Sequence, residues 1–107
     1  MVTNTPSRDA AIKYALDSRW EEASRENLKL LEENPNDIDT LNRLAYSFVK
    51  LGKYRKAKEY YQMVVALDKT NPIALKNLKR IDMISKNDFK KDEVKVSGIA
   101  NFQDVFI

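Results

Sequence analysis

The side chains that carry out most protein chemistry are scarce in this sequence. Its 107 residues include no histidine and no cysteine, which removes the commonest general base, the commonest metal ligand and the thiolate nucleophile. Carboxylates occur as adjacent pairs, at Glu21-Glu22, Glu32-Glu33 and Asp92-Glu93. Neighbouring residues on a helix do not face each other, so the two groups of a pair diverge. We therefore expect no enzymatic activity and no cofactor.

Motifs that hold phosphate or metal ions are also missing. The glycines are Gly52 and Gly98 alone, so no glycine-rich phosphate loop can form. The serines have no histidine partner for nucleophilic catalysis. The polar turn at residues 34–37 lacks the ligand spacing of an EF-hand loop. The sequence therefore favours binding through a shaped surface over a chemical reaction.

Positive charge is concentrated in the middle of the chain. The net charge is +3, but residues 1–37 carry five basic and eight acidic side chains, whereas residues 38–71 carry seven and three. Five of these basic residues surround Tyr54: Lys50, Lys53, Arg55, Lys56 and Lys58. This cluster leaves RNA binding by a helical repeat as an alternative function. The acidic N-terminal third and the expected packing role of Tyr54 count against nucleic acid as the partner.

Apolar residues at helical spacing predict the elements that position these side chains. The predicted helices cover residues 7–18, 20–33, 38–51, 54–67 and 72–86. Helix-breaking residues separate them. Gly52 supplies the left-handed residue that ends a helix, and the segments 34–37 and 69–72 each contain a proline beside residues that cap helices.

The chain repeats itself. When residues 4–37 are shifted by 34 positions onto 38–71, small residues fall on small ones, rings on rings and aliphatic residues on aliphatic ones. The matched pairs are Ala11 with Ala45, Tyr14 with Phe48, Trp20 with Tyr54, Ala23 with Ala57, Leu30 with Val64 and Leu31 with Val65. Alanines let helices approach closely while rings fill the gaps, so each unit is predicted to be an antiparallel helix pair, stacked on the next.

This pattern closely resembles the tetratricopeptide repeat, whose period is about 34 residues. The second unit matches the signature at Leu41, Leu44, Ala45, Phe48, Gly52, Tyr54, Ala57, Tyr61 and Val64, with Lys69 in place of the closing proline. The first unit matches at Ala11, Tyr14, Trp20, Ala23, Leu30 and Pro35. It departs from the signature at Ser7, where a bulky residue is usual, at Ser18, the place of the turn glycine, and at Asn27, the place of an aromatic residue.

The resemblance implies an all-α fold, an α-α superhelix of two helix pairs followed by a C-terminal capping helix and a tail. The helical domain is expected at residues 4–86, with repeats at 4–37 and 38–71 and the capping helix at 72–86. The implied function is a non-enzymatic adaptor or scaffold that binds another protein.

In this family the first helix of each pair lines a concave groove. The groove positions carried over to this sequence are Arg8, Ile12, Leu16, Asn42, Tyr46, Val49, Lys50, Lys76, Arg80 and Met83. The spacing i, i+4, i+7 and i+8 independently places four of them on one helical stripe, rotated away from the core stripe: Asn42, Tyr46, Val49 and Lys50. With basic edges and an apolar floor, such a groove complements an extended peptide that carries acidic and hydrophobic residues. The alternative is an ordinary solvated helix face.

One subfamily grips the C-terminal carboxylate of chaperones with a clamp of Lys, Asn, Asn, Lys and Arg. The corresponding positions here hold Arg8, Ile12, Arg43, Ile73 and Asn77. Only Arg8 keeps the required charge, so we expect no chaperone clamp.

Residues 87–107 begin as a polar linker and return to an apolar set: Val94, Val96, Ile99, Phe102, Val105, Phe106 and Ile107. A disordered terminus and a segment that docks on the capping helix both remain open, because two and a half repeats leave apolar surface uncovered. Self-association could supply the same burial. The longest apolar run, residues 63–67, is far too short to cross a bilayer, so we expect a cytoplasmic protein with no membrane contact.

Overall fold

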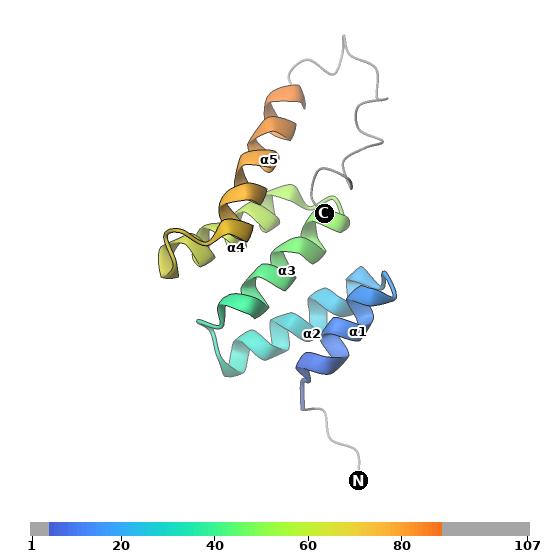
Figure 1. Ribbon diagram of the computed structural model, residues 1–107. Coiled ribbons are helices and arrows are strands. Elements are labelled where there is room, and N and C mark those ends of the chain that lie inside the picture. Colours follow the sequence, from blue (N-terminus) through green and yellow to red (C-terminus); the bar gives the residue numbers. More distant parts are fainter. Residues whose placement is uncertain (1–4, 89–107) are drawn as a thin grey trace.

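Helix-breaking residues divide the chain into five helices (Figure 1). The computed structural model describes residues 5–88, and the side chains of residues 5–85. The helices are α1 (Arg8–Leu16), α2 (Trp20–Glu33), α3 (Ile38–Lys50), α4 (Tyr54–Leu67) and α5 (Pro72–Asp88). The described residues contain no strand, and each helix packs on the next one along the chain. The expected all-α superhelix is confirmed. The predicted tail lies outside the described residues, except for Asn87 and Asp88, which belong to α5 and not to a linker.

The turns within the two helix pairs use the same backbone device. Gly52, after α3, has a φ of +77°, as its predicted role in ending the helix requires. Ser18 occupies the equivalent place after α1 and has a φ of +59°. A side chain is strained in this left-handed region. Serine therefore makes the first turn less stable than glycine would make it.

Side-chain caps fix where α1 and α5 begin. The Ser7 hydroxyl accepts a hydrogen bond from the Ala10 N–H at 3.1 Å, while the Ser7 N–H donates to the Glu26 carboxylate of α2 at 2.8 Å. At α5 the Asn71 side chain accepts from the Ala74 N–H at 3.0 Å, and Pro72 stands at the first helical position, where its missing N–H leaves no bond unmade. The predicted helix over 7–18 is thus shorter at both ends, because Ser7 is a cap and the chain leaves the helix before Ser18.

Alanines lie where helices approach most closely. Ala11, Ala23, Ala45 and Ala57 are all fully buried, as the repeat pattern predicts. Larger side chains fill the space around them, and the Phe48 ring stacks on Tyr60 at a centroid distance of 5.7 Å. A bulkier residue at any alanine would push two helices apart, which typically costs about 1–3 kcal/mol.

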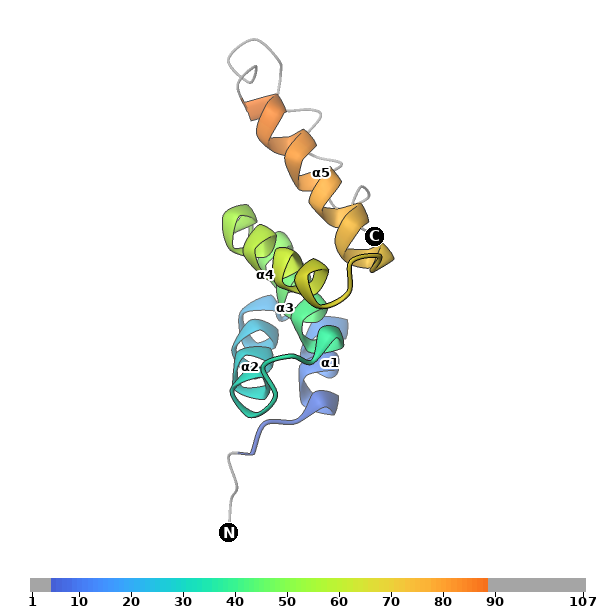
Figure 2. The same ribbon diagram turned by 90° about the vertical axis from the view of Figure 1, so that its left-hand side faces the viewer.

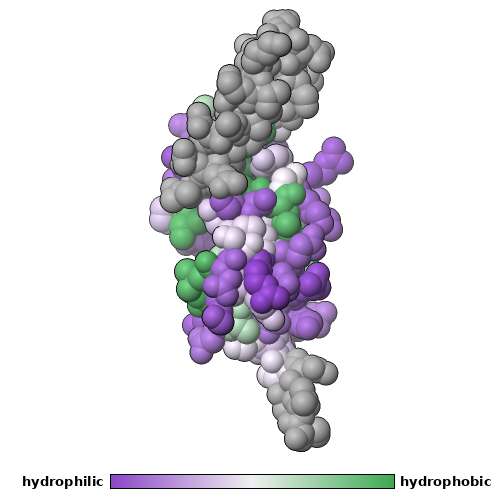
Figure 3. Space-filling view, turned by 90° about the vertical axis from the view of Figure 1, so that its right-hand side faces the viewer, coloured by the Kyte–Doolittle hydropathy of each residue, from purple (hydrophilic) through white to green (hydrophobic). Residues whose placement is uncertain are grey.

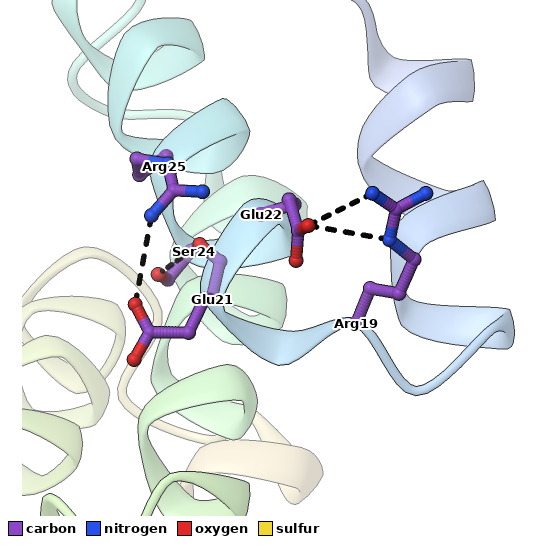
Figure 4. A network of polar contacts seen from close by, with 5 residues as sticks. All are labelled: Arg19, Glu21, Glu22, Ser24 and Arg25. Atoms are coloured by element: carbon purple, nitrogen blue, oxygen red, sulfur yellow. Dashed lines mark hydrogen bonds and ion pairs between the residues drawn. The ribbon is translucent and has the colours of Figure 1, made fainter.

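Exposed charged residues form ion pairs on the surface that contribute little to the stability of the fold. Near the start of α2, Arg19 donates to the Glu22 carboxylate at 2.8 Å, and Arg25 pairs with Glu21 at 3.5 Å (Figure 4). The Arg19 pair lowers the pKa of Glu22 through its hydrogen bond. Such exposed pairs contribute little to stability, so the packing of the alanines and rings is what keeps the helices together.

α5 carries charges where the preceding repeat has core residues. Lys79 and Asp82 stand one repeat after Ala45 and Phe48, yet both are exposed. Asp82 forms an ion pair of 3.4 Å with Lys58 of α4. The assignment of α5 as a capping helix stays a prediction.

Replacing Ser18 with glycine should stabilise the protein, because glycine adopts φ +59° without strain and Ser18 is exposed. We expect the free energy of unfolding to rise by about 0.5–1 kcal/mol after allowing for the extra freedom of glycine in the unfolded chain. Urea denaturation followed by circular dichroism measures this change in the free energy of unfolding.

The matched control is Gly52→Ser in the equivalent turn. A Cβ at Gly52 would meet no atom within 4 Å, so the substitution changes only backbone strain and should lower the free energy of unfolding by about 1 kcal/mol. A Ser18→Gly variant no more stable than wild type would contradict this account of the two turns.

Candidate functional site

A hollow of about 240 Å³ opens between the helices and is lined by side chains from all five of them. Figure 2 shows α2 and α4 on one side of the stack and α1 and α5 on the other, with α3 in the middle. α3 and α5 each supply three of the lining residues. The lining residues are Ala15, Trp20, Asn42, Arg43, Tyr46, Tyr61, Ile73, Lys76 and Asn77.

Three of the groove residues predicted from the sequence meet in this hollow: Asn42, Tyr46 and Lys76. The others lie around it or elsewhere. Arg8, Ile12, Leu16 and Met83 are exposed, while Lys50 and Arg80 are partly buried. The expected stripe is therefore only partly a surface feature.

Val49 departs from the expectation of a groove residue. It is only 5% exposed and belongs to the hydrophobic core. α3 packs on both α2 and α4, so little of its surface stays exposed. The part of the stripe that contains Val49 is covered by this packing. Val49 therefore offers no surface to a partner.

Asn42 is both structural and part of the hollow. Its Nδ2 donates to Asn71 Oδ1 at 3.3 Å, and the same oxygen caps α5. This bond ties α3 to the start of α5 and fixes which way the Asn42 amide points. Its Oδ1 is then shielded from solvent without a hydrogen-bond partner in the described structure.

Asn77 presents a similar group from α5. Its Nδ2 donates to the Tyr61 hydroxyl at 2.9 Å, and its Oδ1 is likewise shielded and unpartnered within the described residues. Burial raises the pKa of Tyr61 well above its ordinary value, so the phenol stays neutral. An unpaired buried carbonyl costs about 1–3 kcal/mol, so each of these two amides lowers the stability of the fold through its oxygen.

Aromatic rings hold one end of the site. Trp20 meets Tyr46 edge to face, with centroids 5.5 Å apart. The Lys50 ammonium lies 5.6 Å from the Trp20 ring and 5.7 Å from the Tyr46 ring, within the range of cation–π attraction. Lys50 is thus held near the hollow by rings, although it does not line it.

Positive charge around the hollow is not neutralised by the described part of the chain. The ion pairs found there join Lys13 to Asp17, Arg19 to Glu22, Arg25 to Glu21, and Lys58 to Asp82. None of these pairs involves Arg8, Lys76 or Arg80, and one guanidinium nitrogen of Arg80 is shielded without a hydrogen-bond partner.

Residues 38–71, which comprise α3, α4 and the turns that follow them, match the family model of the tetratricopeptide repeat. This chain contains a tetratricopeptide repeat. The repeat supplies Asn42, Arg43, Tyr46 and Tyr61 to the hollow, and the helices on either side supply the rest. No curated protein sequence and no solved structure matches the chain.

Sequence reasoning missed several lining residues of the hollow. The sequence predicts only a packing role for Trp20 and Tyr61. It offers Arg43, Ile73 and Asn77 only as positions of a chaperone clamp. The period of the repeat held a usable signal for two of them, because Asn77 stands 34 residues after Arg43. Equivalent positions of successive repeats face the same side of a solenoid.

Three residues of the basic cluster, Lys53, Arg55 and Lys56, line a shallow hollow of about 440 Å³ at the turn of the repeat. Lys56 also lies 5.5 Å from the centroid of the Phe48 ring. The other two do not line this hollow: Lys50 lies over Trp20 and Tyr46, and Lys58 pairs with Asp82.

Within residues 5–88 no three acidic side chains converge in a way that could hold a metal ion. No helix in this range is long and apolar enough to span a membrane.

The buried Tyr61 should make the repeat sensitive to alkali. The pKa of Tyr61 is higher in the folded state than in the unfolded state. The contribution of Tyr61 to the free energy of unfolding is therefore fully present below the unfolded pKa of about 10. It is lost as the pH rises above that value, by at most about 1.4 kcal/mol per pH unit. Urea denaturation at neutral and alkaline pH measures this slope.

The Tyr61→Phe variant separates this effect from the titration of other groups. At neutral pH its free energy of unfolding should be lower than that of wild type by about 1–3 kcal/mol, because the buried Asn77 amide loses its acceptor. Above a pH of about 10, its free energy of unfolding should fall less steeply than that of wild type. The same alkaline slope in both proteins would rule out Tyr61 as the cause.

Proposed function

We propose that this chain is a non-enzymatic adaptor that binds an extended peptide segment with acidic and apolar residues. The binding surface is the hollow together with the exposed residues beside it, which we call the groove. It comprises Arg8, Ile12, Leu16, Asn42, Arg43, Tyr46, Lys50, Lys76 and Arg80. Val49 is left out because it is buried and does not line the hollow, whereas Asn42, which is also buried, lines it. A tetratricopeptide repeat generally serves protein–protein interaction, which supports a protein partner.

The observation that carries the proposal is the hollow itself, in which three of the predicted groove residues, Asn42, Tyr46 and Lys76, line one space. Its lining combines aromatic rings with amide and cationic side chains. Such a mixture can recognise both the apolar and the acidic side chains of an extended peptide.

Charge and hydropathy around the hollow define which peptide would fit. Arg8, Lys76 and Arg80 form no ion pair within the described residues, so carboxylates of a partner would meet cations without competition. Apolar side chains are exposed near the same helices, among them Leu16, which is 79% exposed, and Ile73 at 49%. Figure 3 shows that apolar surface forms separate patches among hydrophilic side chains. Alternating acidic and apolar residues would complement such a pattern.

The test begins with a library of short random peptides displayed with their C-termini fused, from which the wild-type protein selects binders. The fluorescence of Trp20, the only tryptophan in the chain, then measures the affinity for each synthetic peptide, since Trp20 lines the hollow. We expect the selected peptides to combine acidic and apolar residues.

A charge reversal within the groove should weaken binding. Lys76 lines the hollow, whereas Lys79 is exposed one turn further along α5 and does not line it. We expect Lys76→Glu to reduce the affinity for a selected peptide by about tenfold or more, equivalent to about 1.4 kcal/mol, and the matched Lys79→Glu to change it by less than about twofold.

Two outcomes would contradict the proposal. The first is equal weakening by both variants, which would reflect only net charge. The second is that no peptide is selected while single-stranded RNA is retained on a filter with a steep dependence on salt, which would favour the basic cluster instead.

A further inference from the structure

Arg43 has an unusual environment for a cation. It is partly buried in α3 and lines the hollow. Its Nε donates to Asn27 Oδ1 at 3.3 Å, and its Nη2 donates to the Thr40 hydroxyl at 3.0 Å. Both partners are neutral, and no carboxylate within residues 5–88 forms an ion pair with Arg43. A partly buried guanidinium with neutral anchors alone retains an unmet attraction for an anion.

The anchors hold the guanidinium in one orientation. Asn27 is almost fully buried, and its own Nδ2 donates to the Ala23 carbonyl at 2.9 Å. The Asn27 amide therefore cannot turn over, and its oxygen must face Arg43. Thr40 is also buried and donates its hydroxyl hydrogen to Asp37, so the Thr40 oxygen faces Arg43 as an acceptor. A side chain fixed at two nitrogens loses little further freedom when it binds a ligand.

The two anchors also determine which donors remain. A guanidinium has five N–H groups, and Nε shares one edge of the fork with Nη2. That edge is occupied by Asn27 and Thr40. The free donors are both hydrogens of Nη1 and the second hydrogen of Nη2. One N–H of Nη1 and one N–H of Nη2 lie parallel at the end of the guanidinium. This is the geometry that receives the two oxygens of a carboxylate.

The electrostatic surroundings favour an incoming anion. Burial and the nearby positive charge of Arg8 lower the pKa of Arg43, in opposition to the carboxylates of Asp37 and Asp39. Arg43 stays charged at neutral pH, because an arginine in a protein does not lose its proton. An anion between Arg8 and Arg43 would therefore relieve a repulsion as well as form new bonds.

The equivalent contact one repeat later accounts for the arginine at position 43. Asn27 and Arg43 occur 34 residues before Tyr61 and Asn77, and both pairs are hydrogen-bonded. The second pair fills its interface with an aromatic ring and a short amide. In the first pair the aromatic is replaced by Asn27, so the longer arginine side chain occupies the room that the ring would take. The exchange keeps the contact and adds a charge to the hollow.

We propose that Arg43 selects an acidic side chain of the bound peptide, receiving its carboxylate on the free end of the guanidinium while Arg8 adds a second positive charge. This inference rests on the proposed function, because it names the group that the groove recognises. It concerns a carboxylate within a peptide, and the chain terminus of the peptide is a separate source that the experiment distinguishes.

The experiment uses a peptide selected by the wild-type protein, synthesised with Glu or with Gln at its acidic position and with both ends blocked. We expect wild type to bind the Glu form about tenfold more tightly than the Gln form. In Arg43→Gln this ratio should fall below about twofold while the affinity for the Gln form stays the same. A purely structural role of Arg43 would weaken both peptides equally and leave the ratio unchanged.

A second variant guards against a loss of folding. The double substitution Asn27→Tyr/Arg43→Asn copies the Tyr61–Asn77 pair at the equivalent interface, so it removes the charge while restoring a contact that this fold already uses. We expect it to unfold cooperatively and to show the same low ratio as Arg43→Gln. A Gln peptide with a free C-terminal carboxylate shows whether a chain terminus can replace the side chain, and we expect it to bind no more tightly than the blocked Gln form.

The outcomes separate the two proposals. Selected peptides without an acidic preference, a ratio that persists in both Arg43 variants, or full replacement by a terminal carboxylate would overturn the role of Arg43 and leave peptide binding intact. If the wild-type protein selects no peptide, the proposed function itself fails, and this inference fails with it.

Discussion

Close approach of the helices at alanine is the constraint on which the rest of this structure depends. Ala11, Ala23, Ala45, Ala57 and Ala74 are all completely buried, one or more in every helix. With only a methyl group between them, backbones come near enough for polar side chains of consecutive repeats to reach each other. The hydrogen bonds from Arg43 to Asn27 and from Asn77 to Tyr61 exist for this reason. Both join residues 16 positions apart, across the junction of one repeat with the next.

The same polar residues that join the repeats also line the hollow. Asn42 holds the cap of α5 through Asn71, and Asn77 holds α4 through Tyr61, yet each has a carbonyl without a partner in the described structure. The junctions between the helices and the lining of the hollow therefore depend on the same side chains. A substitution that removes the amide affects the junction between helices as well as the hollow, so comparisons between ligands are more informative here than the loss of binding alone.

Much of the fold follows from the sequence because it is set by local rules. Helical spacing and breakers placed all five described helices to within two residues at each end. The recurrence of alanine identified buried contacts such as Ala45 and Ala57 correctly. The predicted helix at 72–86 begins at Pro72 as expected and runs two residues further, to Asp88. The positive φ at Ser18 confirms that the first turn keeps its geometry even where the usual glycine is missing.

The candidate site was less predictable, because it depends on contacts between distant residues. Val49 lies on the predicted stripe but is buried, and a helical wheel cannot show how far the neighbouring helices close over it. Arg43 was passed over because its role arises from Asn27, a residue on another helix. Asn27 had been identified as a departure from the repeat signature, but the size of the gap that it leaves is visible only in three dimensions. The division of the repeats and the identity of the groove residues stay predictions.

The unpaired groups beside the hollow lower the stability of the fold. Two shielded carbonyls without donors in the described structure each cost about 1–3 kcal/mol, which is a large share of the free energy of unfolding of a small domain. The same two amides donate from Asn42 to Asn71 and from Asn77 to Tyr61, so each amide gains one hydrogen bond between helices and leaves its oxygen unpaired. The bonds that they make hold neighbouring helices in register, which gives a physical reason for polar residues in the junctions.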